Sequence, residues 1–222
     1  MSRPTDTSIV RDYCLANGGG VFDLNYAYNH LFRDIPHVNL RKISTRLEKE
    51  GVLRQISKGV FLIGESELDD EGRIIDHYLY EEYVRVGMPC GDYLLYKLGF
   101  KKEKPEVITI RTTKTIGNKK IGNIQILETK SPIVEGVLHS YEIEVVLELL
   151  EHRLHIDEES LQEASELIEK NLKNYYKDFV FKRLSMDHPR NVYIQLATLL
   201  DSMQISHTVM DIYVEKTRLS NL

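Results

Sequence analysis

The sequence has few cysteines and no long apolar run. Only two of its 222 residues are cysteines, Cys14 and Cys90, which excludes a disulfide scaffold or a cysteine-rich zinc module. No apolar stretch approaches the roughly 18–20 residues that a membrane span needs. The first residues, MSRPTDTSIVRDYC, are polar and contain no apolar signal-peptide core. We therefore expect a soluble, cytoplasmic protein with reduced thiols.

Signatures of catalysis and of cofactor binding are also missing. The sequence has no glycine-rich phosphate loop, no internal repeat and no nucleophile elbow. His152 and His155 are one helical turn apart and could share a metal, but nothing nearby completes a site, and we interpret them as part of a solvated helix face. The sequence thus predicts a protein that is not an enzyme and binds no metal or cofactor.

Charge is distributed unevenly along the chain. Residues 1–64 hold nine Lys/Arg against six Asp/Glu, although the whole chain is acidic, with 29 against 34. A basic part joined to an acidic part is typical of a nucleic-acid-binding module attached to a domain with another role. We therefore predict two domains, residues 1–64 and 65–222, with the acidic stretch GESELDDEGR (64–73) at their junction.

Residues 1–64 contain signals for three helices and a hairpin. An amphipathic pattern over 5–16 ends at Gly18, Gly19 and Gly20, and Asp23 can cap a short helix over 24–32. Pro36 then opens a third helix, VNLRKISTRLEKE, which ends at Gly51. The runs VLRQI and VFLI flank the turn Ser57-Lys58-Gly59. This order predicts a winged helix-turn-helix.

The third helix separates an apolar face from a basic face. At 100° per residue, Leu40, Ile43 and Leu47 form one buried stripe. The opposite face carries cations and a hydroxyl, as a helix in the DNA major groove requires. The DNA-binding residues that we predict on the helix and wing are Arg41, Lys42, Thr45, Arg46, Lys49, Arg54, Ser57 and Lys58. The alternative is a solvated helix on a protein-binding winged-helix adaptor.

The run LRKISTRLEKEGVLRQISKGVFLI resembles the N-terminal module of AbiEi-type antitoxins. That family has a helix ending in RL-x-x-x-G and then a wing of the pattern L-R-x-I-x-x-G-V-Y. Here Arg46-Leu47 and Gly51 match the helix end, while Leu53-Arg54, Ile56 and Gly59-Val60 match the wing, with Phe61 at the aromatic position. Downstream, GDYLLYKLGF (91–100) and the strand VITIRTT look like the family's next elements, so the resemblance covers residues 5–130.

This resemblance implies a transcriptional repressor of its own operon, belonging to a type IV toxin–antitoxin system. It implies binding to double-stranded DNA of its own promoter, at inverted repeats. It also implies functional pairing with a nucleotidyltransferase-like toxin encoded beside it, without a stable complex between the two proteins.

The remainder of the chain predicts an α+β domain with a helical tail. We expect helices over 74–86, 92–98, 141–154, 159–181 and 190–203, and strands over 106–113 and 121–129. A turn near residues 117–118 would pair these two strands as an antiparallel hairpin. In the second of the three C-terminal helices, Leu161, Ala164, Leu167, Ile168 and Leu172 follow the helical period.

One constellation indicates a different function. Glu106, Glu128 and Lys130 resemble the PD-(D/E)xK signature of Mg²⁺-dependent nucleases, in which two carboxylates hold the metal and a lysine assists the attacking water. An antiparallel hairpin would bring Glu106 opposite residues 128–130. Because such short motifs recur by chance, we keep the nuclease as an alternative, together with an adaptor whose acidic domain binds a partner protein.

Overall fold

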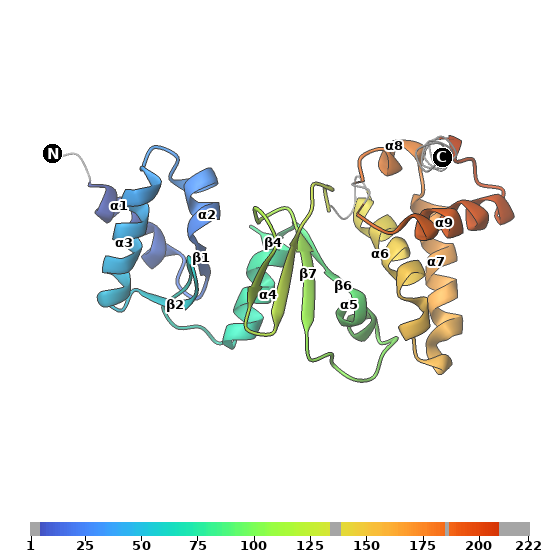
Figure 1. Cartoon of the computed structure of the whole chain (residues 1–222), viewed down its shortest axis with the longest axis horizontal. Coiled ribbons are helices and arrows are strands. Elements are labelled where there is room, and N and C mark those ends of the chain that lie inside the picture. The colour runs from blue at the N-terminus through green and yellow to red at the C-terminus, as the bar shows by residue number, and fades with distance from the viewer. Residues whose placement is uncertain (1–4, 134–138, 185–186, 209–222) are drawn as a thin grey trace.

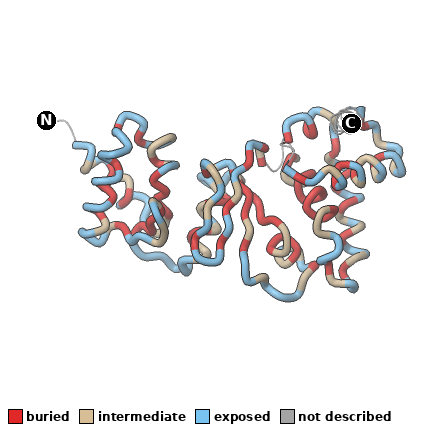
Figure 2. The backbone as a smooth tube through the Cα atoms, viewed as in Figure 1, coloured by how far each residue is buried: buried red, intermediate tan, exposed pale blue. Residues whose placement is uncertain are grey.

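The computed structural model describes residues 5–133, 139–184 and 187–208, and it is a mixed α+β protein. Three units follow one another along its long axis (Figure 1): residues 5–63 at one end, a central sheet with α4 and α5, and the helices α6 to α9 at the other end. Buried residues run through all three units (Figure 2). None of the described helices is long and apolar enough to cross a membrane.

The first unit contains α1 (Asp6–Ala16), β1 (Val21–Asp23), α2 (Leu24–Tyr26), which continues as a π-helix (Ala27–Leu31), then α3 (His37–Lys49), β2 (Leu53–Ser57) and β3 (Val60–Ile63). The three strands are antiparallel in the order β1-β3-β2. The helices and the hairpin lie where we predict them, but β1 was not predicted. Gly59 allows the tight turn between β2 and β3, because its φ of +76° suits glycine.

The central unit contains α4 (Asp70–Leu79), the short hairpin β4 (Tyr80–Glu81) and β5 (Val84–Arg85), β6 (Gly87–Cys90), α5 (Gly91–Leu98), β7 (Ile108–Thr112), β8 (Lys119–Ile121) and β9 (Ile124–Glu128). The helix that we predicted over 74–86 is therefore wrong beyond Leu79. Residues 80–85 form a hairpin instead, in which Tyr80 pairs with Arg85, and the positive φ angles of Glu82 and Tyr83 at its turn are incompatible with a right-handed helix.

The main sheet has the order β6-β7-β9-β8. The predicted antiparallel pairing of 106–113 with 121–129 is wrong, because β7 and β9 are parallel and Thr112 lies beside Glu128. The tight turn lies at Gly122 and Asn123 instead, where it joins β8 to β9 as an antiparallel pair. The signal for a hairpin was present, but the sequence offered two Gly-Asn turns and did not distinguish them.

The last unit contains α6 (Ser140–Glu151), two 3-10 helices (Arg153–His155 and Glu158–Ser160), α7 (Leu161–Tyr175), α8 (Asp178–Phe181) and α9 (Arg190–Ser202). The single helix predicted over 159–181 is thus interrupted after Tyr175. The predicted apolar stripe of α7 is confirmed, because Ala164, Ile168 and Leu172 are buried in the core that α6, α8 and α9 share.

Apolar contacts cross the junction between the first two units. Val21, Val60 and Leu62 of the first sheet pack in one cluster with Ile74 and Tyr78 of α4. The side chain of Arg73 adds polar contacts, donating hydrogen bonds to the carbonyl oxygens of Gly19, Gly20, Ile63 and Gly64 at 2.8–3.2 Å. The first sheet is therefore covered on one side by its own helices and on the other by the central unit.

Candidate nucleic-acid interface

The third helix has the two faces that we predicted. Leu40, Ile43 and Leu47 are no more than 6% exposed and pack in the core of the first unit. The five polar positions expected to face outward are all exposed, and they are Arg41, Lys42, Thr45, Arg46 and Lys49. Helix periodicity and burial therefore agree over the whole length of α3.

A groove of about 390 Å³ joins one edge of α3 to the hairpin. Arg41 and Thr45 line it from α3, and Ser57 and Lys58 line it from the β2–β3 turn. Lys42, Arg46 and Lys49 do not line the groove and lie on the remaining exposed face of α3. Within the described part of the chain, Arg41, Lys42, Lys49 and Lys58 make no ion pair, which leaves their charges available for an anionic ligand.

Three of the predicted residues are partly occupied by other contacts, and the first is Thr45, whose hydroxyl donates a hydrogen bond of 3.1 Å to the carbonyl oxygen of Arg41. The Arg54 guanidinium donates two hydrogen bonds to the carboxylate of Asp70, at 2.6 and 2.8 Å, and does not line the groove. Arg46 donates a long hydrogen bond, 3.4 Å, to the hydroxyl of Thr7. Of the eight residues that we predicted, four line the groove, three lie on the adjoining face of α3, and Arg54 points to the start of α4.

Residues from the central unit also line this groove, which the sequence did not indicate. Ile116, Asn118 and Lys119 reach it from the segment between β7 and β9. Lys119 is fixed there by an ion pair with Asp23, in which Nζ lies 2.6 Å from Oδ2. Nothing in the local sequence near residue 116 points to residues 41 or 58, so only the folded chain reveals the contribution.

Asp23 connects the first unit to the central sheet. Its Oδ1 caps α2, as predicted, by accepting hydrogen bonds from the backbone N–H groups of Asn25 and Tyr26 at 3.0 and 3.3 Å. Its Oδ2 accepts from the Tyr78 hydroxyl at 2.7 Å and from Lys119. Burial and the negative charge of Asp23 together raise the pKa of Tyr78 far above its usual value. Asp23 therefore links α2, whose Leu24 and Asn25 line the same groove as Arg41, to the central unit.

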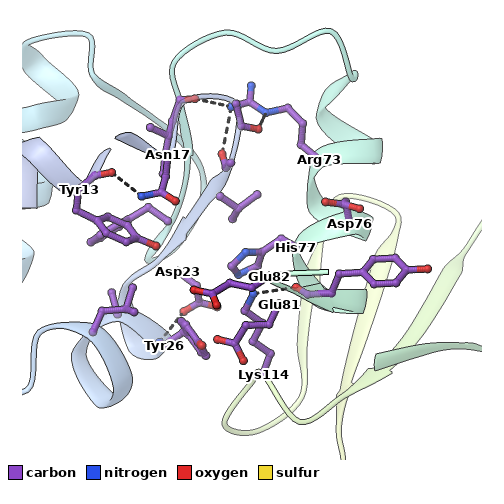
Figure 3. Close-up of a pocket in the computed structure, with 18 of the residues that line it drawn as sticks. Tyr13, Asn17, Asp23, Tyr26, Arg73, Asp76, His77, Glu81, Glu82 and Lys114 are labelled. Atoms are coloured by element: carbon purple, nitrogen blue, oxygen red, sulfur yellow. Dashed lines mark hydrogen bonds between the residues drawn. The ribbon is translucent and has the colours of Figure 1, made fainter. Parts of the chain in front are cut away.

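A second hollow, of about 270 Å³, lies between α1 and α4. In Figure 3, Tyr13 and Asn17 lie on one side of it, and Arg73, Asp76 and His77 lie on the other. Burial lowers the pKa of His77 to about 3, and the positive charge of Lys114 contributes in the same direction. His77 is therefore neutral at physiological pH.

The nuclease constellation is not assembled. Because β7 and β9 are parallel, Glu106 precedes one end of β7 while Glu128 ends β9 beside Thr112, at the opposite end of the sheet. Glu128 instead binds the loop between β7 and β8, its Oε2 accepting a hydrogen bond of 2.8 Å from the N–H of Gly117. Glu106 and Lys130 are both exposed. The hypothesis that these three residues share a metal is wrong.

The cysteines and the paired histidines occupy separate structural positions. Cys14 and Cys90 are buried and free, and burial raises the pKa of Cys14 to about 11, so its thiol is protonated. His155 pairs with Asp92 at 2.7 Å, whereas His152 lies 3.6 Å from Glu148. The two imidazoles therefore face different carboxylates.

Comparison with known proteins gives no family assignment. The sequence matches no protein-family model, and no curated protein is recognisably similar to it.

Proposed function

We propose that residues 1–64 form a winged helix-turn-helix that binds double-stranded DNA through α3 and the β2–β3 hairpin. The observation that carries this proposal is the groove in which Arg41 and Thr45 of the helix adjoin Lys58 of the turn. The order of three helices and two later strands, with β1 completing the sheet, supports the same assignment.

Each part of the surface has a role in this proposal. A helix enters the major groove with its core face held by the protein and its outer face toward base edges and phosphates. Arg41 can donate two parallel hydrogen bonds to a guanine, while the hydroxyl of Thr45 suits several bases. Lys42, Lys49 and Lys58 are suited to phosphates, because an exposed ammonium group neutralises a backbone charge without selecting a sequence.

We further propose that the chain is an antitoxin-type regulator that represses its own operon. The resemblance of residues 5–130 to AbiEi-type antitoxins supports this, as does the acidic balance of the chain beyond residue 64. Negative charge disfavours contact with the DNA backbone, so we assign this remainder, apart from the three groove residues Ile116, Asn118 and Lys119, to the toxin pathway rather than to the operator. The proposed partner is a nucleotidyltransferase-like toxin, and the proposed protein is a cytoplasmic regulator without enzymatic activity.

DNA binding is tested by fluorescence anisotropy with the protein's own promoter and with random duplex DNA. We expect Arg41→Ala and Thr45→Ala to reduce the preference for the promoter by about 1–3 kcal/mol where a good base contact is lost. Lys58→Ala should weaken binding to both duplexes and reduce the salt dependence, because it removes a phosphate contact. The matched control is Lys170→Ala, which removes an exposed lysine from α7.

The regulatory proposal is tested by co-expression with the neighbouring toxin. We expect the Arg41→Ala/Lys42→Ala double variant to lose repression of a promoter reporter but still to restore growth. If the wild-type protein shows no preference for its own promoter at moderate salt, the proposal that it is a repressor is contradicted. A double variant that loses both repression and growth rescue would show that protection depends on DNA binding.

A further inference from the structure

A cluster of buried charged residues joins the central sheet to the helical unit. Arg111 of β7 lies among Glu144 and Glu148 of α6 and His188, which precedes α9, and all four side chains are less than a tenth exposed. Arg111 Nη1 lies 3.4 Å from Glu144 Oε2, and Arg111 Nη2 lies 3.0 Å from Glu148 Oε1. Glu151, one turn beyond Glu148, completes the cluster at its more exposed side.

The carboxylates in this cluster exceed the permanent cations. Glu144 and Glu148 face a single guanidinium, that of Arg111, while Glu151 faces the imidazole of His188. Glu144 Oε1 and Glu148 Oε1 are fully buried, and neither accepts a hydrogen bond within the described chain, since the 3.0 Å contact to Arg111 lacks hydrogen-bond geometry. Buried carboxylate oxygens that accept no hydrogen bond are costly, and a second cation beside them would relieve that cost.

His188 is oriented as a metal ligand usually is. Its Nδ1 lies 2.7 Å from Glu151 Oε2, and its Nε2 lies 3.0 Å from Glu144 Oε2. In metal sites, the ring nitrogen that does not bind the metal commonly donates its hydrogen to a carboxylate, which fixes the tautomer and the ring. Glu144 Oε2 is in that position, and Arg111 Nη1 lies beside both groups, 3.4 Å from Glu144 Oε2 and 3.1 Å from His188 Nε2.

We propose that Glu148, Glu151 and His188 bind a divalent transition-metal cation of the Zn²⁺ or Mn²⁺ class. One ligand atom from each of these residues lies within 4.8 Å of the others. Glu148 and Glu151 share a face of α6 because they are three residues apart. Imidazole and carboxylate ligands together suit such cations.

The site is accessible from one side. The Glu151 side chain is 26% exposed, while that of His188 is fully buried, so a cation reaches the site past Glu151 and water can complete its coordination. The bound cation would tie α6 to the segment before α9. This inference does not depend on DNA binding, because the cluster lies outside the first unit.

The experiment uses the full-length protein, stripped with a chelator and then titrated with ZnCl₂, MnCl₂ or MgCl₂ by calorimetry and by thermal unfolding. We expect one Zn²⁺ or Mn²⁺ per chain and a Tm increase of roughly 5–10 °C when the free cation is about 100-fold above its Kd. Mg²⁺ should bind much more weakly, since it prefers an all-oxygen octahedron.

Variants distinguish this site from adventitious binding. Glu151→Gln, at the exposed side of the cluster, should abolish binding while the protein stays folded. Glu144→Gln should weaken it about 10–100-fold through the orientation of His188. Glu163→Gln, an exposed carboxylate on α7, is the matched control and should bind as the wild type does. Absence of stoichiometric binding, or unchanged binding by Glu151→Gln, would overturn the proposal.

Discussion

Two groups of charged residues in this protein differ in what their charges are free to do. On α3 and the hairpin, Arg41 and Lys58 are exposed and unpaired within the described chain. At the junction with the helical unit, Arg111 is buried among carboxylates. Water solvates an exposed cation at little cost, whereas a buried one must be compensated by the fold. The first group is available to a ligand, and Arg111 is committed to structure.

The largest expected effect is at Arg111. Replacing Arg111 with Met leaves Glu144 and Glu148 buried without their counter-ion, and we expect the free energy of unfolding to fall by about 3–5 kcal/mol. Urea denaturation measures this change. Arg41→Met is the matched control, and we expect it to alter stability by less than about 0.5 kcal/mol. Equal effects of the two substitutions would invalidate the distinction between the groups.

Asp23 is a buried carboxylate that has both a cation, Lys119, and hydrogen-bond donors as partners. Asp23→Ala removes the cap of α2 and leaves the Tyr78 hydroxyl without its acceptor. We expect a loss of about 2–4 kcal/mol, from roughly 1 for the cap and 1–3 for the buried donor. Asp23→Ala combined with Tyr78→Phe should cost less than the sum of the two single changes. Strict additivity would show that the 2.7 Å contact contributes nothing.

His77 makes stability depend on pH. Its pKa is lowered to about 3 in the folded protein, whereas an unfolded histidine titrates near 6.5. The unfolded chain therefore binds more protons between these values, so the contribution of neutral His77 is present above about pH 6.5 and is lost as the pH falls. Between pH 7.5 and 5.5, we expect the wild type to lose about 1 kcal/mol more than His77→Phe. Parallel pH profiles from urea denaturation would contradict this assignment.

The smallest effect is expected at Arg54, whose ion pair with Asp70 is geometrically good but exposed. A double-mutant cycle of Arg54→Ala and Asp70→Ala should give a coupling energy of about 0.2–1 kcal/mol, which decreases with added salt. A coupling energy as large as the loss of stability expected for Arg111→Met would mean that burial does not decide how much an ion pair contributes.

The sequence predicted the exposed group well because its signal is local. The 3.6-residue period of α3 gives both the stripe of Leu40 and Leu47 and the exposure of Arg41, without knowledge of any other element. The turn at Lys58 and Gly59 is likewise encoded within a few residues. Local patterns were misleading where the structure depends on which strands pair, as in the parallel arrangement of β7 and β9.

The buried group could not be predicted in the same way. Arg111, Glu144 and His188 are separated by 33 to 77 residues, and each in isolation has the appearance of an ordinary polar residue. Ile116 could not be predicted to line the groove for the same reason, since it is far in sequence from Arg41 and Lys58. Strand β1 is three residues long, and its pairing with β3 follows from the completed unit rather than from its own sequence.

The four carbonyl oxygens held by Arg73 have a consequence for residues 65–69, which connect β3 to α4. The acidic composition of this connection would by itself suggest a flexible linker between two domains that move independently. With Arg73 bound to the end of β3 and to the glycines after α1, the peptide chain here is not what keeps the two units together. A protease that cuts this connection would leave two fragments that migrate as a single particle until a denaturant separates them.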